Sequence, residues 1–291
     1  MSNRFTRAVS WDNYGTHDNS KYPELWADCV RAICPSLGPT GNKLVDLALP
    51  GAERGTIDGT STSTWVVNEG KWAYDVYDNL ARTNFTYGVL LGASHITISC
   101  WYRPDAFMVY GVLYKESVTG SASNRIFLAT REDGTFGIGG FAPDVGSFQF
   151  WKSNQILSAG KWYHVCGTLS VIGDLGAIYI NGIPQTLGST GDFSNQALDA
   201  SASSVVSMGA SNFASPSDFP DGLIDDLRVY RRVLQPEEIM LLAQERGIAY
   251  TPIKRTTYFF TGDLTVGSSS RYLSIGGKLI GTGGKIIGVS Y

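Results

Sequence analysis

Short runs of alternating apolar and polar residues, separated by glycine-rich turns, recur along most of the 291-residue chain. Alternation over about four to eight residues is typical of a β-strand with one buried face. Because successive side chains of a strand point to opposite faces, these runs predict an all-β protein whose apolar positions meet between sheets. The predicted strands are 72–77, 96–102, 109–114, 125–130, 135–138, 147–151, 161–169, 177–180, 205–208 and 223–230.

Two glycine-containing dipeptides between these runs predict tight hairpins. Asp133-Gly134 and Asn181-Gly182 each separate two predicted strands. Such dipeptides favour two-residue type I′ turns, because both central positions need a positive φ angle.

One convincing helix is predicted near the end of the alternating region. Pro236 stands at a first helical position, two glutamates follow it, and Gly247 suits a left-handed residue after the helix. We expect about three turns, packed on the edge of the sheets. Residues 25–33 have two interpretations, a short helix beginning at Pro23 or a first strand.

Composition narrows the class of protein further. Hydrophobic residues make up 43% of the chain, charged residues 17%, and there are 34 glycines. This balance suits a sheet protein with many turns. With a net charge of −3 and no run of basic residues, no nucleic-acid partner is expected. No segment has the length and apolar character of a membrane-spanning helix, so no membrane insertion is expected either.

Four cysteines occur in the chain. Cys100 and Cys166 lie in predicted core strands and are expected to be free, buried thiols. Cys29 and Cys34 are separated by four residues, and a local disulfide between them remains an alternative.

The last forty residues differ in character from the rest. Gly276-Gly-Lys-Leu-Ile-Gly-Thr is followed by the similar Gly283-Gly-Lys-Ile-Ile-Gly-Val. The glycines exclude a helix, and two short strands with a glycine corner fit better. Such strands have open edges and favour pairing with another chain. The residues expected to mediate assembly are Tyr258, Phe259, Phe260, Leu279, Ile280, Ile286 and Ile287.

Several ordered stretches resemble the laminin-G-like, concanavalin A-like lectin/glucanase superfamily. They are Ile96-Thr-Ile-Ser-Cys-Trp-Tyr-Arg-Pro, Lys161-Trp-Tyr-His-Val-Cys-Gly-Thr-Leu, Ile178-Tyr-Ile-Asn-Gly-Ile-Pro and Gly222-Leu-Ile-Asp-Asp-Leu-Arg-Val-Tyr. The resemblance implies a two-sheet antiparallel jelly-roll sandwich over residues 25–247, with an arm at 1–24 and a Gly-rich β tail at 248–291 for assembly or anchoring.

The resemblance also implies a structural calcium site. In this family an aspartate at the place of Asp225 often helps to hold calcium, and Asp46 is a candidate second ligand. The alternative is that Asp225 accepts hydrogen bonds from backbone amides and binds no metal. Since neighbouring strand residues face opposite ways, Asp226 is free to pair with a residue such as Arg228.

Carbohydrate binding is a second expectation, because aromatic faces on exposed loops are the usual platform for sugars. Trp151, Phe213 and Phe219 are the candidate rings, with Asn212 and Asp218 as partners for hydroxyl groups. The alternative for all three rings is packing in the core or at the rim.

No catalytic arrangement is evident. Glycosidases need two carboxylates that flank the sugar bond. The related glucanases carry Glu-x-Asp-x-x-Glu on one strand, and no such run occurs in this chain. No serine or cysteine nucleophile accompanies a histidine in a recognisable motif. The sequence therefore predicts a protein that is not an enzyme.

These features favour a virion structural or decoration protein, of phage origin, that presents a surface-adhesion domain. Domains of this type usually act outside the cell, yet residues 1–20 lack the apolar middle of a secretory signal. The expected partners are other virion proteins or copies of the chain, and surface glycans. The alternative is a free carbohydrate-binding module, calcium-dependent or not, at an extracellular or cell-surface location.

Overall fold

The structure is a computed structural model, and its contacts divide the chain into two units. One unit comprises residues 12–253, and the other combines 1–11 with 254–291. The described residues are 15–17, 21–40, 43–48, 54–58, 65–76, 82–85, 88–118, 125–141, 149–193, 204–210, 218–252, 265–266, 272–275 and 278–281.

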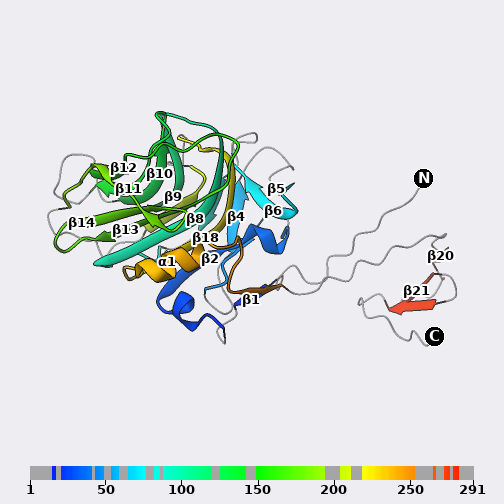
Figure 1. Cartoon of the computed structure of the whole chain (residues 1–291). Helices are drawn as coiled ribbons and strands as arrows, with labels where there is room; N and C mark the ends of the chain where they lie inside the picture. Colours follow the sequence, from blue (N-terminus) through cyan, green and yellow to red (C-terminus); the bar gives the residue numbers. More distant parts are fainter. Residues whose placement is uncertain are drawn as a thin grey trace. The chain divides into compact units, whose positions relative to one another are not determined.

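Two antiparallel sheets form the layers of the first unit (Figure 1). In the described part of the chain, the larger sheet has nine strands in the order β16 (Leu187–Ser189), β12 (Gln149–Ser153), β11 (Phe136–Phe141), β10 (Arg125–Arg131), β9 (Tyr110–Val118), β17 (Ser204–Met208), β7 (Arg82–Phe85), β4 (Arg54–Asp58) and β3 (Lys43–Val45). The second runs β15 (Ile183–Pro184), β14 (Leu175–Ile180), β13 (Tyr163–Ser170), β8 (His95–Ala106), β18 (Asp221–Tyr230), β6 (Lys71–Asp75) and β5 (Trp65–Asn68), with β2 (Cys29–Ile33) also paired to β18. The predicted all-β, two-sheet jelly-roll sandwich is confirmed.

The core lies between the two sheets and follows the alternation of the sequence. Ile126 and Leu128 of β10 are fully buried in it, as are Ile98 of β8 and Val165 of β13. The layers approach closely at Gly167, where an added Cβ would lie 2.6 Å from Cβ of Ile138 on the opposite sheet. A glycine is therefore needed at this contact, since interiors are close-packed.

A second apolar cluster covers the outer face of the β8–β13–β14 sheet. It joins α1 (Pro236–Leu242) and the 3-10 turn η1 (Pro23–Trp26) to the sheet. Ile239 and Leu242 of α1 belong to the same cluster as Cys166 and Tyr179, the outward residues of β13 and β14. The helix thus packs on a face of the sandwich, and the expectation of an edge position is wrong.

Local details refine the predictions for the helical segments. The helix has seven residues, two turns instead of three, and a capping box between Gln235 and Glu238 begins it. Gly247 has the expected positive φ of 75°. Residues 23–33 adopt both alternatives in succession, because η1 is followed directly by β2.

The two predicted hairpins differ in turn type. Asn181 and Gly182 both have positive φ, 53° and 77°, so the type I′ turn is confirmed there. At the other hairpin Gly134 has a φ of 74° while Asp133 is outside the positive region. The Gly134 amide donates to the Arg131 carbonyl at 2.8 Å, so a three-residue loop with a left-handed glycine replaces the predicted type I′ turn.

All four cysteines are buried and free, which leaves no local disulfide between Cys29 and Cys34. Burial raises the pKa of the Cys29 thiol to about 12, so it remains protonated. Within the described ranges, helices long and apolar enough to cross a membrane are absent.

The ends of the first unit are paired with each other. Strand β1 (Gly15–His17) runs antiparallel to β19 (Tyr250–Pro252). The unit therefore extends beyond the predicted domain limits of 25 and 247 on both sides.

The second unit contains a small antiparallel sheet of β20 (Thr265–Val266), β21 (Tyr272–Ile275) and β22 (Lys278–Gly281). Leu279 and Ile280 lie on β22, opposite Ser274 and Leu273. The other predicted assembly residues, Tyr258, Phe259, Phe260, Ile286 and Ile287, lie outside the described residues.

Candidate functional site

Two of the rings predicted to form an exposed sugar-binding platform, Trp151 and Phe219, are buried. Trp151 is 1% exposed and stacks on Phe193, with ring centroids 5.6 Å apart, and Phe219 is 9% exposed. The expectation of open ring faces at Trp151 and Phe219 is wrong, and the packing alternative holds for both. Asn212 and Phe213 lie outside the described residues. Asp218, the third of the five that the structure describes, is exposed and lines a hollow in the protein surface.

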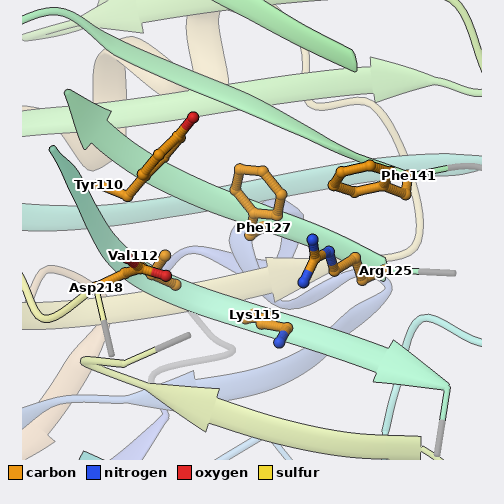
Figure 2. A pocket seen from close by; sticks show the side chains of 7 residues that line it. All are labelled: Tyr110, Val112, Lys115, Arg125, Phe127, Phe141 and Asp218. Carbon is orange, nitrogen blue, oxygen red and sulfur yellow. The ribbon is translucent and has the colours of Figure 1, made fainter. Parts of the chain in front are cut away.

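This hollow lies on the outward side of the nine-stranded sheet and has a volume of about 260 Å³. Strands β9, β10 and β11 supply most of its wall, together with the segment that precedes β18. Figure 2 shows its seven lining side chains, Tyr110, Val112, Lys115, Arg125, Phe127, Phe141 and Asp218.

Strand register brings these residues together. Phe127 of β10 lies opposite Lys115 of β9, and Arg125 of β10 lies opposite Phe141 of β11. Arg125 and Phe127 face outward because the intervening Ile126 points into the core. A bulge in the β9–β10 ladder keeps Val112 on the outward face, opposite Ala129.

Two glycines of β11 make the floor flat. An added Cβ on Gly137 or Gly139 would lie 2.7 Å from a ring atom of Phe150. Without those side chains, the Phe150 ring covers β11 and stacks on Phe127 at a centroid distance of 6.0 Å and an interplanar angle of 28°. The result is a continuous aromatic surface beside the hollow.

Positive charge gathers at one side of this surface. The Arg125 guanidinium lies 4.4 Å above the Phe141 ring centroid, and Figure 2 shows the two side chains next to each other. The Arg125 Nε is buried and has no hydrogen-bond partner. Burial, together with the nearby Arg125, lowers the pKa of Lys115 to about 8, while Asp218 opposes this shift.

Chemically, the hollow offers ring faces, two cations and one carboxylate. Aromatic faces hold apolar faces of a ligand, while charged groups at the rim bind its polar substituents. Among the lining residues that the structure describes, Asp218 is the one carboxylate. Those described residues therefore contain no pair of carboxylates flanking a bond, as glycoside hydrolysis requires.

Three of the four carboxylate oxygens of Asp46 and Asp225, the proposed calcium ligands, already have hydrogen-bond partners within the protein. Asp46 Oδ1 accepts from the amides of Ala32 and Ala48 at 2.9 and 3.0 Å, and Oδ2 pairs with Arg31 Nε at 3.2 Å. Asp225 Oδ1 accepts from the amides of Ser36 and Asp226. Over the residues described here, no group of three or more His, Cys, Asp or Glu side chains is arranged to hold a metal ion. The residues present do not fit the expected two-aspartate calcium site.

Asp225 is fully buried, and its Oδ2 has no hydrogen-bond partner. Burial and then the adjacent Asp226 raise the pKa of the Asp225 carboxyl to about 7, despite Arg246 Nε at 3.8 Å. Asp225 accepts hydrogen bonds from two backbone amides, which is the role that the alternative to calcium binding gave it.

Asp226 pairs with Arg228, as the sequence predicted. Arg228 Nε and Nη2 donate to Oδ1 and Oδ2 of Asp226 at 2.8 and 3.2 Å, and the Gly247 amide donates to Oδ2 at 3.0 Å. A bulge interrupts β18 between Asp225 and Arg228, and Asp226 has a φ of 45° at this point.

Sequence reasoning missed six of the seven lining residues. The available signal was the Arg125-Ile-Phe127 alternation, which places a cation and a ring on the face that does not enter the core. Two glycines on one face of the following strand, Gly137 and Gly139, were a second signal of a flat surface. Neither signal identifies the neighbouring residues without the strand order.

A comparison with curated proteins found no match to this chain. Among solved structures, domain 4 of AbnA, a GH43 extracellular arabinanase from Geobacillus stearothermophilus in complex with arabinotriose, is 18% identical with a TM-score of 0.57. The match covers 75% of this chain and 98% of that one. Trypanosoma rangeli sialidase is 14% identical with a TM-score of 0.50, over 75% of this chain and 32% of the sialidase.

These likenesses show a shared fold. A family model described as the concanavalin A-like lectin/glucanases superfamily, Laminin_G_3, matches residues 78–240. The matched region contains β8 to β18, and so most of both sheets and every residue that lines the hollow. The chain therefore belongs to the concanavalin A-like lectin/glucanases superfamily.

Proposed function

We propose that this protein is a non-catalytic carbohydrate-binding module whose ligand occupies the hollow on the outward face of β9, β10 and β11. The observation that carries the proposal is the combination of half-buried rings, Tyr110 and Phe141, with polar groups at their edge. The likeness to arabinanase domain 4, determined in complex with arabinotriose, adds support from the same fold.

The lining residues favour binding over hydrolysis. One carboxylate, Asp218, can accept hydrogen bonds from sugar hydroxyls, but the described lining residues include no second carboxylate to act with it. Incubation of the protein with arabinan, xylan and pectin oligosaccharides should therefore release no new reducing ends. Turnover that Asp218→Asn abolishes would contradict the proposal.

Binding is tested by calorimetric titration of the same oligosaccharides into the full chain. Replacing Phe141 by alanine removes one ring of the hollow and should weaken binding roughly tenfold, as truncation of a central contact residue does. Tyr22→Ala is the matched control, because Lys21 lies 4.8 Å above the half-buried Tyr22 ring in a comparable cation–ring pair. Equal losses for both variants, or no binding by the native protein, would refute the site.

We propose an assembly role in a virion as a second function. Its support is the separate small sheet of β20, β21 and β22 in the glycine-rich region, in a unit distinct from the sandwich. A three-stranded sheet with short strands buries little surface alone and suits pairing with another chain. Sedimentation velocity should give a defined oligomer for the full chain and a monomer after deletion of 254–291. A monomeric full chain would contradict this role.

A further inference from the structure

Two cationic side chains converge on the hollow from neighbouring strands. Lys115 lies opposite Phe127, and Arg125 is two positions from Phe127 on the same face of β10. Both line the hollow, where Asp218 is the single carboxylate among the residues described, although the chain as a whole carries a net charge of −3. Like charges placed together in a partly buried site repel each other. Asp218 acts on both cations, but its single charge does not balance two, so an anionic ligand would complete the compensation.

Arg125 has the more specific geometry of the two. The Phe141 ring lies beneath its guanidinium plane, so hydrogen bonding is left to the edge of the group. Its Nε is one of the buried polar atoms that lack a hydrogen-bond partner. A buried donor without an acceptor is costly, and an acceptor brought by a ligand would remove this cost.

We propose that the hollow binds the carboxylate of an acidic sugar residue, between Arg125 and Lys115. This inference rests on the proposed carbohydrate-binding function and names its ligand class. The planar Arg125 guanidinium matches a carboxylate through parallel donors, and the Lys115 ammonium adds a point charge. The sugar ring then faces the half-buried Tyr110, and Asp218 accepts from a hydroxyl group.

The size of the hollow limits the ligand to a single charged unit. Pockets that enclose drug-sized ligands have volumes of roughly 300–1,000 Å³. The hollow, at about 260 Å³, lies just below this range. It therefore accommodates one sugar residue, and the rest of an oligosaccharide extends over the sheet surface.

The titration of Lys115 gives the proposal a characteristic pH dependence. Among the described residues, the charged groups that act on this amine are Arg125, which lowers its pKa, and Asp218, which raises it. With a pKa of about 8, Lys115 is charged at pH 7 and largely neutral at pH 9. Arg125 stays charged throughout, because guanidinium groups are not deprotonated in proteins. Affinity for an acidic sugar should therefore fall as the pH rises from 7 to 9.

The first test compares acidic oligosaccharides with their own methyl esters, which lack the negative charge and add only a methyl group. Oligogalacturonate, oligomannuronate and sialyllactose, each beside its methyl ester, are titrated into the full chain at pH 6.5. At least one acid should bind about tenfold more tightly than its ester. Binding of neutral oligosaccharides or esters alone would overturn the acidic ligand and leave the carbohydrate-binding function standing, whereas failure of every sugar would overturn both. A preference for sulfated neutral sugars would overturn the carboxylate assignment.

The second test uses variants of matched charge. Lys115→Gln and Arg125→Gln should each abolish the preference for acid over ester. Arg131→Gln is the control. Arg131 is on β10 like Arg125 and lies 3.9 Å above a ring, that of Tyr110, but it does not line the hollow. Arg131→Gln should retain the preference for acid over ester. An equal loss in this variant would mean that the positive charge of the whole surface, and not contact with Lys115 and Arg125, causes the preference.

The two cationic positions also differ in their pH profiles. Between pH 7 and 9 the native protein should lose about tenfold in affinity for the acid, while Lys115→Gln should show a flat profile. Arg125→Lys keeps the charge but loses the planar group, so it should bind the acid more weakly than the native protein. A native profile that is flat over this range would contradict the role of Lys115. Thermal melting of each variant confirms that the fold is intact.

Discussion

Arg228 and Arg125 lie on the two different sheets, and both are stacked on aromatic rings. Arg228 lies 4.7 Å above the Tyr250 ring and donates to both oxygens of Asp226. Arg125 lies 4.4 Å above the Phe141 ring, and its Nε has no partner. Both arginines contact a ring. They differ at Nε, because Arg228 Nε donates to the Asp226 carboxylate whereas Arg125 Nε has no acceptor in the protein. The difference separates an arginine that holds the fold from one available to a ligand.

The largest effect on stability is expected at the buried ion pair of Arg228 and Asp226, where the protein itself supplies both charges. Arg228→Met leaves the buried Asp226 without its ion-pair partner, and breaking such a pair costs about 3–5 kcal/mol in the free energy of unfolding. Urea denaturation at pH 7 measures it. The double variant Asp226→Asn with Arg228→Met should recover part of the loss, because no uncompensated charge is then buried. If Arg228→Met alone were as stable as the native protein, Arg228 would not hold the fold, and the comparison with Arg125 would fail.

An intermediate effect is expected at Asp225, whose carboxyl has a pKa of about 7 in the folded protein. An aspartate in the unfolded chain has a pKa of about 3.9, so between pH 4 and 7 the folded state holds a proton that the unfolded state has lost. This group therefore decreases stability as the pH rises through that window, by about 2–4 kcal/mol in total.

Asp225→Asn keeps an oxygen for the amides of Ser36 and Asp226 but cannot titrate. Urea denaturation of both proteins at several pH values from 4 to 7.5 should show a steeper decline for the native protein. Other buried carboxyls, such as Glu116, titrate in both proteins and cancel in the difference. Parallel curves would show that Asp225 does not titrate in this range.

The smallest effect on stability is expected at Arg125. Methionine retains contact with the Phe141 ring and removes the buried donor that has no acceptor. We expect Arg125→Met to stay within about 0.5 kcal/mol of the native free energy of unfolding, measured beside Arg228→Met in the same denaturant series. A loss as large as that of Arg228→Met would show that both arginines serve the fold and would end the distinction between them.

The fold could be predicted because each strand carries its own signal. The alternation around Ile98, Ile126 and Val165 reports burial directly, and the Asn181-Gly182 turn reports its hairpin. The helix was overestimated by one turn, because its apolar pattern continues past the last helical residue, Leu242.

The candidate site could not be predicted in the same way. Its residues come from three strands and a loop, and they become neighbours only through the strand order and the bulge in the β9–β10 ladder. Trp151 was taken as a candidate sugar-binding ring at the end of a predicted strand, and it proved to be an inward-facing core residue. Asp218 was found because it was sought as a polar neighbour of a loop.

The pairing of β1 with β19 has a consequence for how the sandwich can be connected. Gly15 lies opposite Pro252, so the chain enters and leaves the folded unit at adjacent points. A short peptide could join these two positions while new termini are opened at the Asp133-Gly134 loop, and such a circular permutant should still fold. For the same reason the sandwich could be inserted as a cassette into a surface loop of another protein without forcing that loop apart.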